Sequence, residues 1–306
     1  MVKVNQETFC ISINLQVEDN IFSELKSTFS KSAAGRRLYV NGKEKKKLAQ
    51  LRRSFPMLWI TPYDEKIFTG SASLRRNFLD RLICNFDFSH SQRINNYNKL
   101  IQQRSKVLKT NSEDTIWLET IEDQLAKLAV AISSTRLDIV NRLSIFLSEK
   151  IIGFPKLKIE FIDSIENNLL KEPAIKIEET LKLKLKDSRK LDLMMGGSLY
   201  GSHKTEFFCY NKEKNMPADM CSSGEQKLLL VSIILSCAKA LKKSINIPPI
   251  MLLDEVFTHL DLNKKNYLFN ELMSMGSQIW ITTTETDNFL KKYDNVYYYE
   301  LKKGKV

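Results

Sequence analysis

Two consecutive carboxylates, Asp254 and Glu255, follow an apolar run that reads Pro-Pro-Ile-Met-Leu-Leu. Such a run is typical of a buried parallel strand, and open α/β sheets bind ligands at the carboxyl ends of their strands. Asp254 could therefore hold Mg²⁺, and Glu255 could take a proton from water that attacks a γ-phosphate. The pattern predicts a Walker B strand; a buried strand that merely ends in acids is the structural alternative.

A second candidate is the segment Cys221-Ser-Ser-Gly-Glu-Gln-Lys, which precedes a long apolar stretch beginning at Leu228. Ser and Gly are common where helices begin, and the free amides and dipole at that end attract anions. The segment predicts a phosphate-recognising helix start that uses Ser223, Gly224 and Gln226. A plain helix cap is the alternative.

A third segment, Phe257-Thr-His-Leu-Asp261, comes directly after the two acids and precedes an amphipathic stretch and the short apolar run Gln278-Ile-Trp-Ile-Thr282. The order is helix, Asp-Glu strand, His-Leu-Asp loop, helix and strand. This order is expected of the second half of an ATP-binding-cassette ATPase. The predicted fold class is therefore α/β: an ABC-type ATPase head, with a P-loop-like mixed sheet and helices, and an inserted helical second lobe.

The elements that must position these segments fall into three parts. Residues 1–73 alternate in strand fashion, with an Asn41-Gly42 hairpin turn, and are assigned to the N-terminal part of the head. Residues 74–194 carry helical periodicity, with two long helices on either side of 110–114, a strand over 156–162 and a helix over 175–186. Residues 195–306 complete the head, beginning with a strand pair expected over 199–210.

Composition narrows the class of protein. The chain has 306 residues, a formal charge of +11, 43% hydrophobic and 27% charged residues, so a folded protein of one large or two modest domains is expected. Five scattered cysteines without a Cys-x-x-Cys pair argue against a disulfide framework or a zinc site. No apolar run approaches the roughly 18 residues of a membrane span, so we expect a cytoplasmic protein without membrane contact.

The positive charge is consistent with a polyanionic partner. Nine basic residues lie between Lys31 and Arg53, against the single acid Glu44. A solvated hairpin flank and a phosphate-facing surface are both compatible with this cluster. The candidate DNA contacts are Arg36, Arg37, Lys45 and Lys46, together with Arg75 and Arg76.

Taken together, these motifs resemble the RecF family of bacterial recombination mediators, relatives of the heads of structural-maintenance-of-chromosomes proteins. Further segments that carry the resemblance are Trp59-Ile-Thr-Pro-Tyr-Asp, Gly70-Ser-Ala-Ser-Leu-Arg-Arg-Asn-Phe-Leu-Asp-Arg and Tyr200-Gly-Ser-His-Lys. The resemblance spans nearly the whole chain. The role of the His203-Lys204 segment is not evident from sequence.

The resemblance implies an ATP-dependent protein of DNA replication, recombinational repair and the SOS response. Such a protein would bind single-stranded DNA and gapped duplexes and would assist RecO and RecR in loading RecA. ATP and Mg²⁺ would be its cofactors, with Asp254 on the metal and Glu255 as general base. Ser223, Gly224 and Gln226 would contact nucleotide bound to the other subunit of an ATP-dependent homodimer, and Asp261 would act as its D-loop.

One part of the family pattern is missing. The sequence contains no GxxxxGK[ST] phosphate loop; the nearest segment, Gly35 to Glu44, has six residues between its glycines and Glu after its Lys. The chain resembles the family without its first sixty or so residues, as a fragment or a degenerate protein would. ATP hydrolysis is therefore doubtful for this chain as given.

Two alternatives stay open. One is a non-catalytic DNA-binding or partner-binding remnant of an ABC-type ATPase. The other is a different cassette-type chromosome or repair ATPase, although residues 74–194 are too few for a long coiled-coil arm.

Overall fold

The computed structural model describes residues 8–17, 21–30, 35–44, 55–283, 290, 293 and 295–300. The chain forms two compact units, residues 1–56 and 57–306. Each unit is described by itself below.

The first unit is a four-stranded antiparallel sheet in the order β1 (Thr8–Val17), β2 (Ile21–Ser30), β3 (Gly35–Val40) and β4 (Lys43–Glu44). The predicted hairpin turn is confirmed, because Val40 pairs with Lys43 across Asn41 and Gly42. Both turn residues have positive φ, 50° and 74°, which suits the twist of a two-residue hairpin and favours Asn-Gly. The segment from Gly35 to Glu44 is thus a hairpin and not a strand-to-helix phosphate loop.

The second unit contains a three-stranded parallel sheet in the order β10 (Ile279–Thr282), β9 (Ile250–Asp254) and β5 (Met57–Ile60). The predicted parallel strand before Asp254 is therefore confirmed. Burial alternates along β9, with Met251 and Leu253 buried and Ile250 and Leu252 only half-buried. The apolar run is continuous in sequence, but the described residues bury only one face of the strand.

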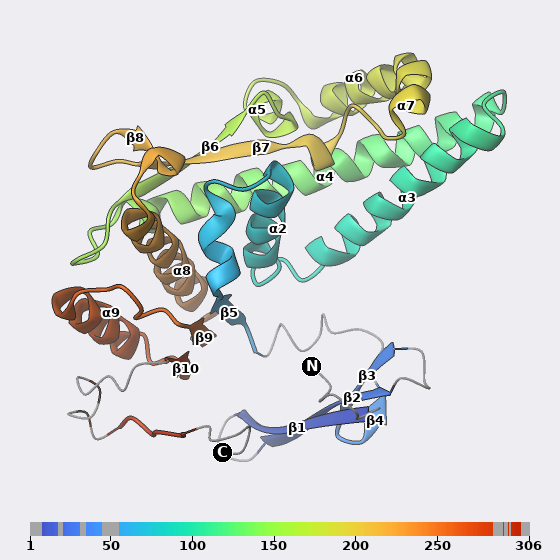
Figure 1. The fold of residues 1–306 in the computed structure, drawn as a ribbon. Helices are drawn as coiled ribbons and strands as arrows, with labels where there is room; N and C mark the ends of the chain where they lie inside the picture. The colour runs from blue at the N-terminus through green and yellow to red at the C-terminus, as the bar shows by residue number, and fades with distance from the viewer. Residues whose placement is uncertain are drawn as a thin grey trace. The chain divides into compact units, whose positions relative to one another are not determined.

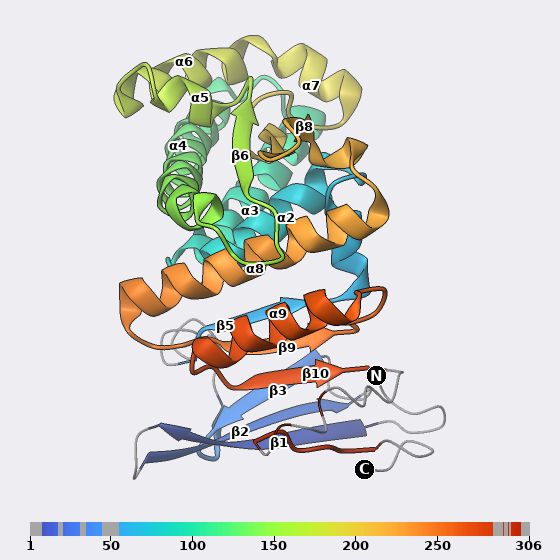
Figure 2. The same ribbon diagram turned by 90° about the vertical axis from the view of Figure 1, so that its left-hand side faces the viewer.

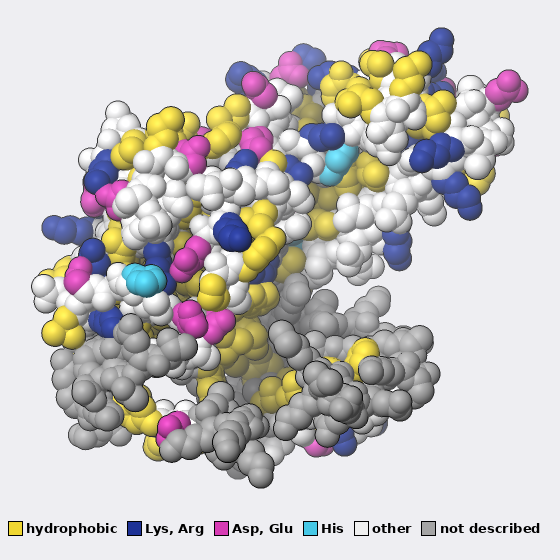
Figure 3. Space-filling view, in the orientation of Figure 1, with side chains coloured by type: hydrophobic (Ala, Val, Ile, Leu, Met, Phe, Trp, Pro, Cys, Tyr) yellow, Lys and Arg dark blue, Asp and Glu magenta, His cyan; other side chains and the backbone are white. Residues whose placement is uncertain are grey.

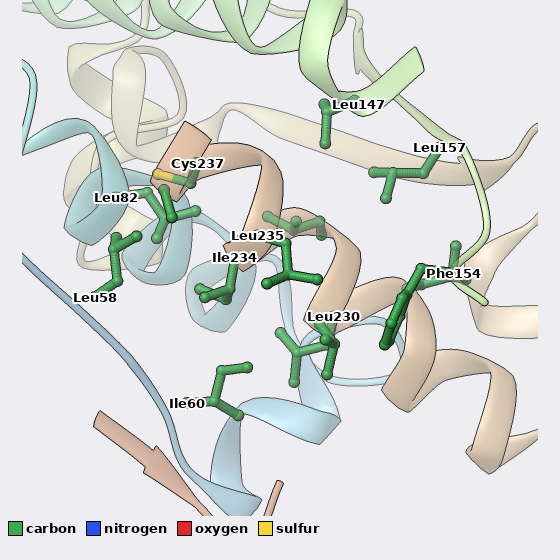
Figure 4. Packing of buried hydrophobic residues seen from close by; sticks show 14 of the residues in the cluster. Leu58, Ile60, Leu82, Leu147, Phe154, Leu157, Leu230, Ile234, Leu235 and Cys237 are labelled. Atoms are coloured by element: carbon green, nitrogen blue, oxygen red, sulfur yellow. The ribbon is translucent and has the colours of Figure 1, made fainter. Parts of the chain in front are cut away.

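The buried face of this sheet packs against α8 (Ser223–Ile245), which Figure 2 shows lying across it. Nearly every residue of α8 from Gln226 to Leu241 is buried, so the helix is enclosed on all sides, as an apolar run of that length predicts. Figure 4 shows Leu230, Ile234 and Leu235 of α8 among side chains of β5, α2 and α4. α9 (Leu262–Ser274) adds Leu268, Phe269 and Leu272 to the same cluster.

The helical lobe is built on a hairpin of two long helices, α3 (His90–Thr110) and α4 (Thr115–Ser148), as predicted (Figure 1). α2 (Ala72–Ile83) precedes them, and α6 (Ala174–Asp187) and α7 (Arg189–Met195) lie along the first half of α4. α3, the first half of α4 and α6 share a hydrophobic cluster of their own. The second half of α4 belongs to the cluster around α8.

A second small sheet joins β6 (Leu157–Ile162), β7 (Glu206–Asn211) and β8 (Met216–Pro217) in antiparallel register. Short helices flank it: α5 (Ile165–Leu169), η2 (Ser202–Lys204) and η3 (Ala218–Met220). The strand pair expected over 199–210 is only partly correct. Residues 199–205 form a loop and η2, because their polar side chains and backbone bind neighbouring helices instead of a strand.

The described surface of the helical lobe includes an apolar region. Figure 3 shows hydrophobic side chains gathered over α6 and α7. Leu191, Met194 and Met195 of α7 are 54%, 81% and 69% exposed. Among the described residues, no helix is long and apolar enough to span a membrane.

Candidate nucleotide site

Asp254 is the last residue of β9, and Glu255 follows it in a left-handed backbone conformation with φ 53°. The hydroxyl of Thr282, at the end of the neighbouring strand β10, donates to Asp254 Oδ1. The Glu255 amide donates to the carbonyl oxygen and hydroxyl of Thr282, both at 3.2 Å. Because β9 and β10 run parallel, their carboxyl ends meet, and Thr282 of the adjacent strand holds the carboxylate of Asp254 and the backbone amide of Glu255.

The predicted phosphate-recognising segment lies at the start of α8, as expected. Ser222 is the N-cap, and it forms a reciprocal capping box with Glu225. Ser223 and Gly224 are therefore in the first helical turn and are exposed. Glu225 also pairs with Lys214 of the β7–β8 turn, and hydrogen bonding to Lys214 lowers the pKa of Glu225 to about 2.

Gln226 lies differently from its neighbours. It is 9% exposed, and its amide group donates to the carbonyl oxygens of Cys221 at 3.1 Å and Asp219 at 3.3 Å. These bonds hold the loop that leads into α8. In this structure the exposed residues of the predicted set are Ser223 and Gly224.

One residue that the motif reading passed over connects these segments. Lys227 Nζ lies 3.0 Å from the carbonyl oxygen of Glu255 and 3.1 Å from Glu65 Oε1. Glu65 belongs to η1 (Pro62–Ile67), directly after β5. Sequence offered one signal for Lys227, since a lysine inside an otherwise buried helix needs a partner.

Asp261, the predicted D-loop residue, caps α9. Its carboxylate accepts from the Lys264 amide at 2.9 Å and pairs with Lys264 Nζ at 3.1 Å. These hydrogen bonds with Lys264 lower the pKa of Asp261. His259, two residues earlier, is exposed and has φ 64°, so the loop from 255 to 261 contains two left-handed residues that are not glycine.

An apolar groove of about 540 Å³ ends at Asp254 on the outer face of the parallel sheet. Trp280 of β10 lines it and is 55% exposed. The remaining lining residues come from all three strands: Met57, Trp59, Ile60, Thr61, Leu252, Leu253 and Thr282.

Arg75 and Arg76 of α2 are engaged within the second unit. Arg75 pairs with Glu206 at 2.9 Å, donates to the Gly70 carbonyl at 2.8 Å and stacks over Phe208. Arg76 donates to the Thr205 carbonyl at 2.8 Å, and burial followed by the nearby Arg136 lowers its pKa. Both guanidinium groups thus fasten α2 to β7 and the loop before it.

The other candidate DNA contacts belong to the first unit. Arg37 lies in β3 and is exposed. Lys45, Lys46 and the side chain of Arg36 lie outside the described residues.

The segment from Ser198 to Thr205, whose role was not evident from sequence, binds several helices. His203 Nε2 donates to the Ser198 carbonyl at 2.9 Å, and its Nδ1 accepts from the Tyr97 hydroxyl at 2.8 Å. A Cβ on Gly201, whose φ is 133°, would lie 2.0 Å from that hydroxyl, so only glycine fits there. The segment therefore connects α3 to the start of β7.

No family model matches the chain. It is 32% identical over 273 residues to the DNA replication and repair protein RecF of Agrobacterium fabrum, covering 89% of this chain and 72% of that protein. It is 34% identical over 269 residues to RecF of Rickettsia typhi, covering 87% and 74%.

Solved structures of RecF share the fold. A structure of the recombination mediator protein RecF-ATP in the RecFOR pathway superposes with a TM-score of 0.80 at 25% identity, covering 94% of this chain and 77% of that one. A second, RecF-ATPrS, gives a TM-score of 0.79 at 23% identity. The sequence relatives cover most of the chain and the predicted ABC-type head is the RecF fold, so this chain belongs to the RecF family of DNA replication and repair proteins.

Proposed function

We propose that this chain is a DNA-binding protein of recombinational repair and replication that acts on single-stranded DNA and gap junctions. In this role it assists RecO and RecR in loading RecA. We further propose that it works in the cytoplasm and forms a homodimer when nucleotide is bound.

One observation carries the proposal. Two acids stand at the carboxyl end of a parallel strand, and the start of the signature helix α8 is bonded to the second acid through Lys227. This contact ties the helix whose first turn would meet the nucleotide of the other subunit to the two acids that would serve this subunit's own nucleotide. A strand that ended in acids for structural reasons alone would not require such a contact.

The residues fit one half of a Mg-ATP site. Asp254 supplies a carboxylate of the kind that Mg²⁺ prefers, and Thr282 orients it. A bound Mg²⁺ would neutralise phosphate charge, and Glu255 would accept the proton of attacking water. The other half, a backbone cradle with a lysine, has no counterpart in the sequence, so hydrolysis by this chain alone is not proposed.

DNA binding would be mainly electrostatic. The chain carries a formal charge of +11, and exposed Arg37 lies within the basic stretch from Lys31 to Arg53. Lys and Arg that neutralise phosphates release counterions, so affinity should fall steeply with salt and depend little on base sequence. Arg75 and Arg76 are weaker candidates because protein carbonyls and Glu206 already occupy their guanidinium groups.

A second candidate function is a DNA-binding or partner-binding remnant without catalysis. The basic stretch from Lys31 to Arg53, with exposed Arg37, favours it, since such a stretch can contact DNA without nucleotide. The two functions differ in one measurable respect, which is whether nucleotide alters DNA binding.

The test is equilibrium Mg-ATP binding to the 306-residue chain beside a chimera that carries an upstream phosphate-loop segment from a relative. We expect only the chimera to bind ATP, and Glu255→Gln in the chimera to lower turnover by about 10²-fold or more while sparing binding. Binding of a gapped duplex to the chimera is then measured from low to high salt with and without ATP. Loss of DNA binding even at low salt would refute the first function and a DNA-binding remnant, and salt-sensitive binding that ATP never changes would select the remnant.

A further inference from the structure

Lys227 joins three segments that carry family motifs. It lies in the second turn of α8, is 7% exposed, and its ammonium contacts the Glu255 carbonyl and the Glu65 carboxylate at 3.0 Å and 3.1 Å. An ammonium has three donors and no acceptor, and a lysine is buried only where such partners are available. The signature helix, the Asp-Glu segment and the turn after β5 therefore meet at one charged group.

The backbone that Lys227 contacts is a strained one. Glu255 has φ 53°, a conformation that a side-chain-bearing residue adopts only when its surroundings hold it there. Its amide is held by Thr282 of β10, and its carbonyl accepts from Lys227 of α8 and, within the same turn, from the Thr258 amide at 3.2 Å. Glu255 is thus fixed at both ends by two elements that are distant in sequence.

The geometry points to Lys227 as a positioning residue that holds Glu255 in its left-handed conformation and links its position to that of the signature helix. Through this link, a movement at the start of α8 would be passed on to Glu255. Ser223 and Gly224 face solvent about one helical turn before Lys227, where the proposed function has them contact the nucleotide of the other subunit. The Lys227 side chain would transmit a movement of that turn to Glu255, the general base of the same chain.

The description of Glu255 as general base rests on the proposed function. The contact by which Lys227 holds the Glu255 carbonyl, here called the clamp, does not. The clamp is therefore tested on the 306-residue chain without nucleotide or DNA. A failure of ATP or DNA binding leaves this test unchanged, and a failure of the clamp leaves the proposed function standing.

The measurement is hydrogen exchange of backbone amides by residue-resolved NMR. Lys227→Met should speed exchange of the Glu255 amide at least tenfold while amides in the middle of α8 change less than threefold. The matched control is Lys239→Met, which removes another α8 lysine, one that pairs with Glu271 at 2.6 Å, and should leave the Glu255 amide unchanged. Equal exchange at Glu255 in the two variants would overturn the proposal.

A second comparison separates the clamp from a simple ion pair. Glycine adopts positive φ without strain, so in a Glu255→Gly background Lys227→Met should speed exchange of the residue 255 amide by less than threefold. Glu65→Gln, which keeps the carbonyl contact, should change it by less than twofold. If Glu65→Gln reproduces the effect of Lys227→Met, or if the effect persists fully with glycine at 255, Lys227 only pairs with Glu65. If Lys227→Met alone does not fold, the double variant with Glu255→Gly is compared with it. Amide exchange at least tenfold slower in the double variant would still support the clamp, and no slowing would refute it.

Discussion

At the scale of single residues, Arg136 organises the junction between the head and the helical lobe. It is 3% exposed, binds both oxygens of Asp80 at 2.8 Å and donates to the Ser202 carbonyl at 2.7 Å. Burial by itself would raise the pKa of Asp80, but hydrogen bonds from Arg136 and His90 lower it. Asp80, the acid of the Arg-Arg-Asn-Phe-Leu-Asp motif, therefore holds α4 through Arg136.

Replacement of Arg136 by methionine should destabilise the chain by about 3–5 kcal/mol, because it leaves the buried Asp80 carboxylate without its guanidinium partner and with His90 alone. Urea unfolding measures this. The matched control, Arg142→Met on the same helix, breaks an exposed pair with Asp138 and should cost about 0.5 kcal/mol or less. A loss at Arg136 no larger than that of the control would contradict the assignment.

His203 should make stability depend on pH. Burial, followed by the charges of Lys204 and Arg76, lowers the pKa of His203, while the Ser198 carbonyl and Asp192 oppose the shift. The folded chain then binds fewer protons than the unfolded chain in mildly acidic solution. Stability is full above the ordinary histidine pKa of about 6.5 and is lost as pH falls through it, levelling off below the folded pKa.

The check is the free energy of unfolding between pH 8 and pH 5. His203→Gln should flatten the pH dependence over this range. The same slope in His203→Gln as in the unchanged chain would show that His203 does not titrate differently in the folded chain.

At the scale of elements, α9 shows how one residue can serve two purposes. Asp261 is the N-cap of α9 and also the predicted D-loop residue of a dimer. A capping role alone explains the residue type, since Asp and Asn are both strong N-caps.

The capping contribution of Asp261 can be measured by substitution. Asp261→Ala should lower stability by about 1 kcal/mol through loss of the cap, and Asp261→Asn should keep the stability within a few tenths of a kcal/mol. Thermal unfolding measures both. Equal losses for the two variants would show that the charge, and not the cap, stabilises α9.

At the scale of the whole molecule, the second unit holds two hydrophobic clusters connected by α4. Leu118, in the first half of α4, belongs to the distal cluster with α3 and α6, and Leu229 of α8 belongs to the larger one. Both side chains are fully buried. Cooperative units of this kind often open separately.

Leu118→Ala and Leu229→Ala should each cost about 2–5 kcal/mol at their own cluster. Hydrogen exchange should then rise in α3 and α6 for Leu118→Ala, with little change in α8 or β9. Leu229→Ala should show the reverse. Equal acceleration of α3 and α8 by Leu118→Ala would mean that the unit opens as one piece.

Much of the fold could be read from sequence because its signals are local. The spacing of apolar residues located α3 and α4, Asn41-Gly42 located a hairpin, and the Ser-Ser-Gly segment marked the start of α8. The sequence did not say which serine is the N-cap, since Ser222 and Ser223 are equally good caps and only the helix geometry distinguishes them. The prediction of strand for residues 199–205 was wrong, because the partners of this loop lie on five helices, α2, α3, α4, α5 and α7.

The sequence by itself determined the order of the motifs, the parallel strand before Asp254 and the membership of the RecF family. Each of these is read from motifs, and every motif is a short run of residues close together in the chain. Only the tertiary structure decided which charged groups meet. Lys227 reaches Glu255, Arg76 reaches Thr205 and Arg136 reaches Asp80 across many intervening residues. Such pairs follow from how helices and strands pack around shared clusters, and a buried charge takes whichever partner the packing places beside it.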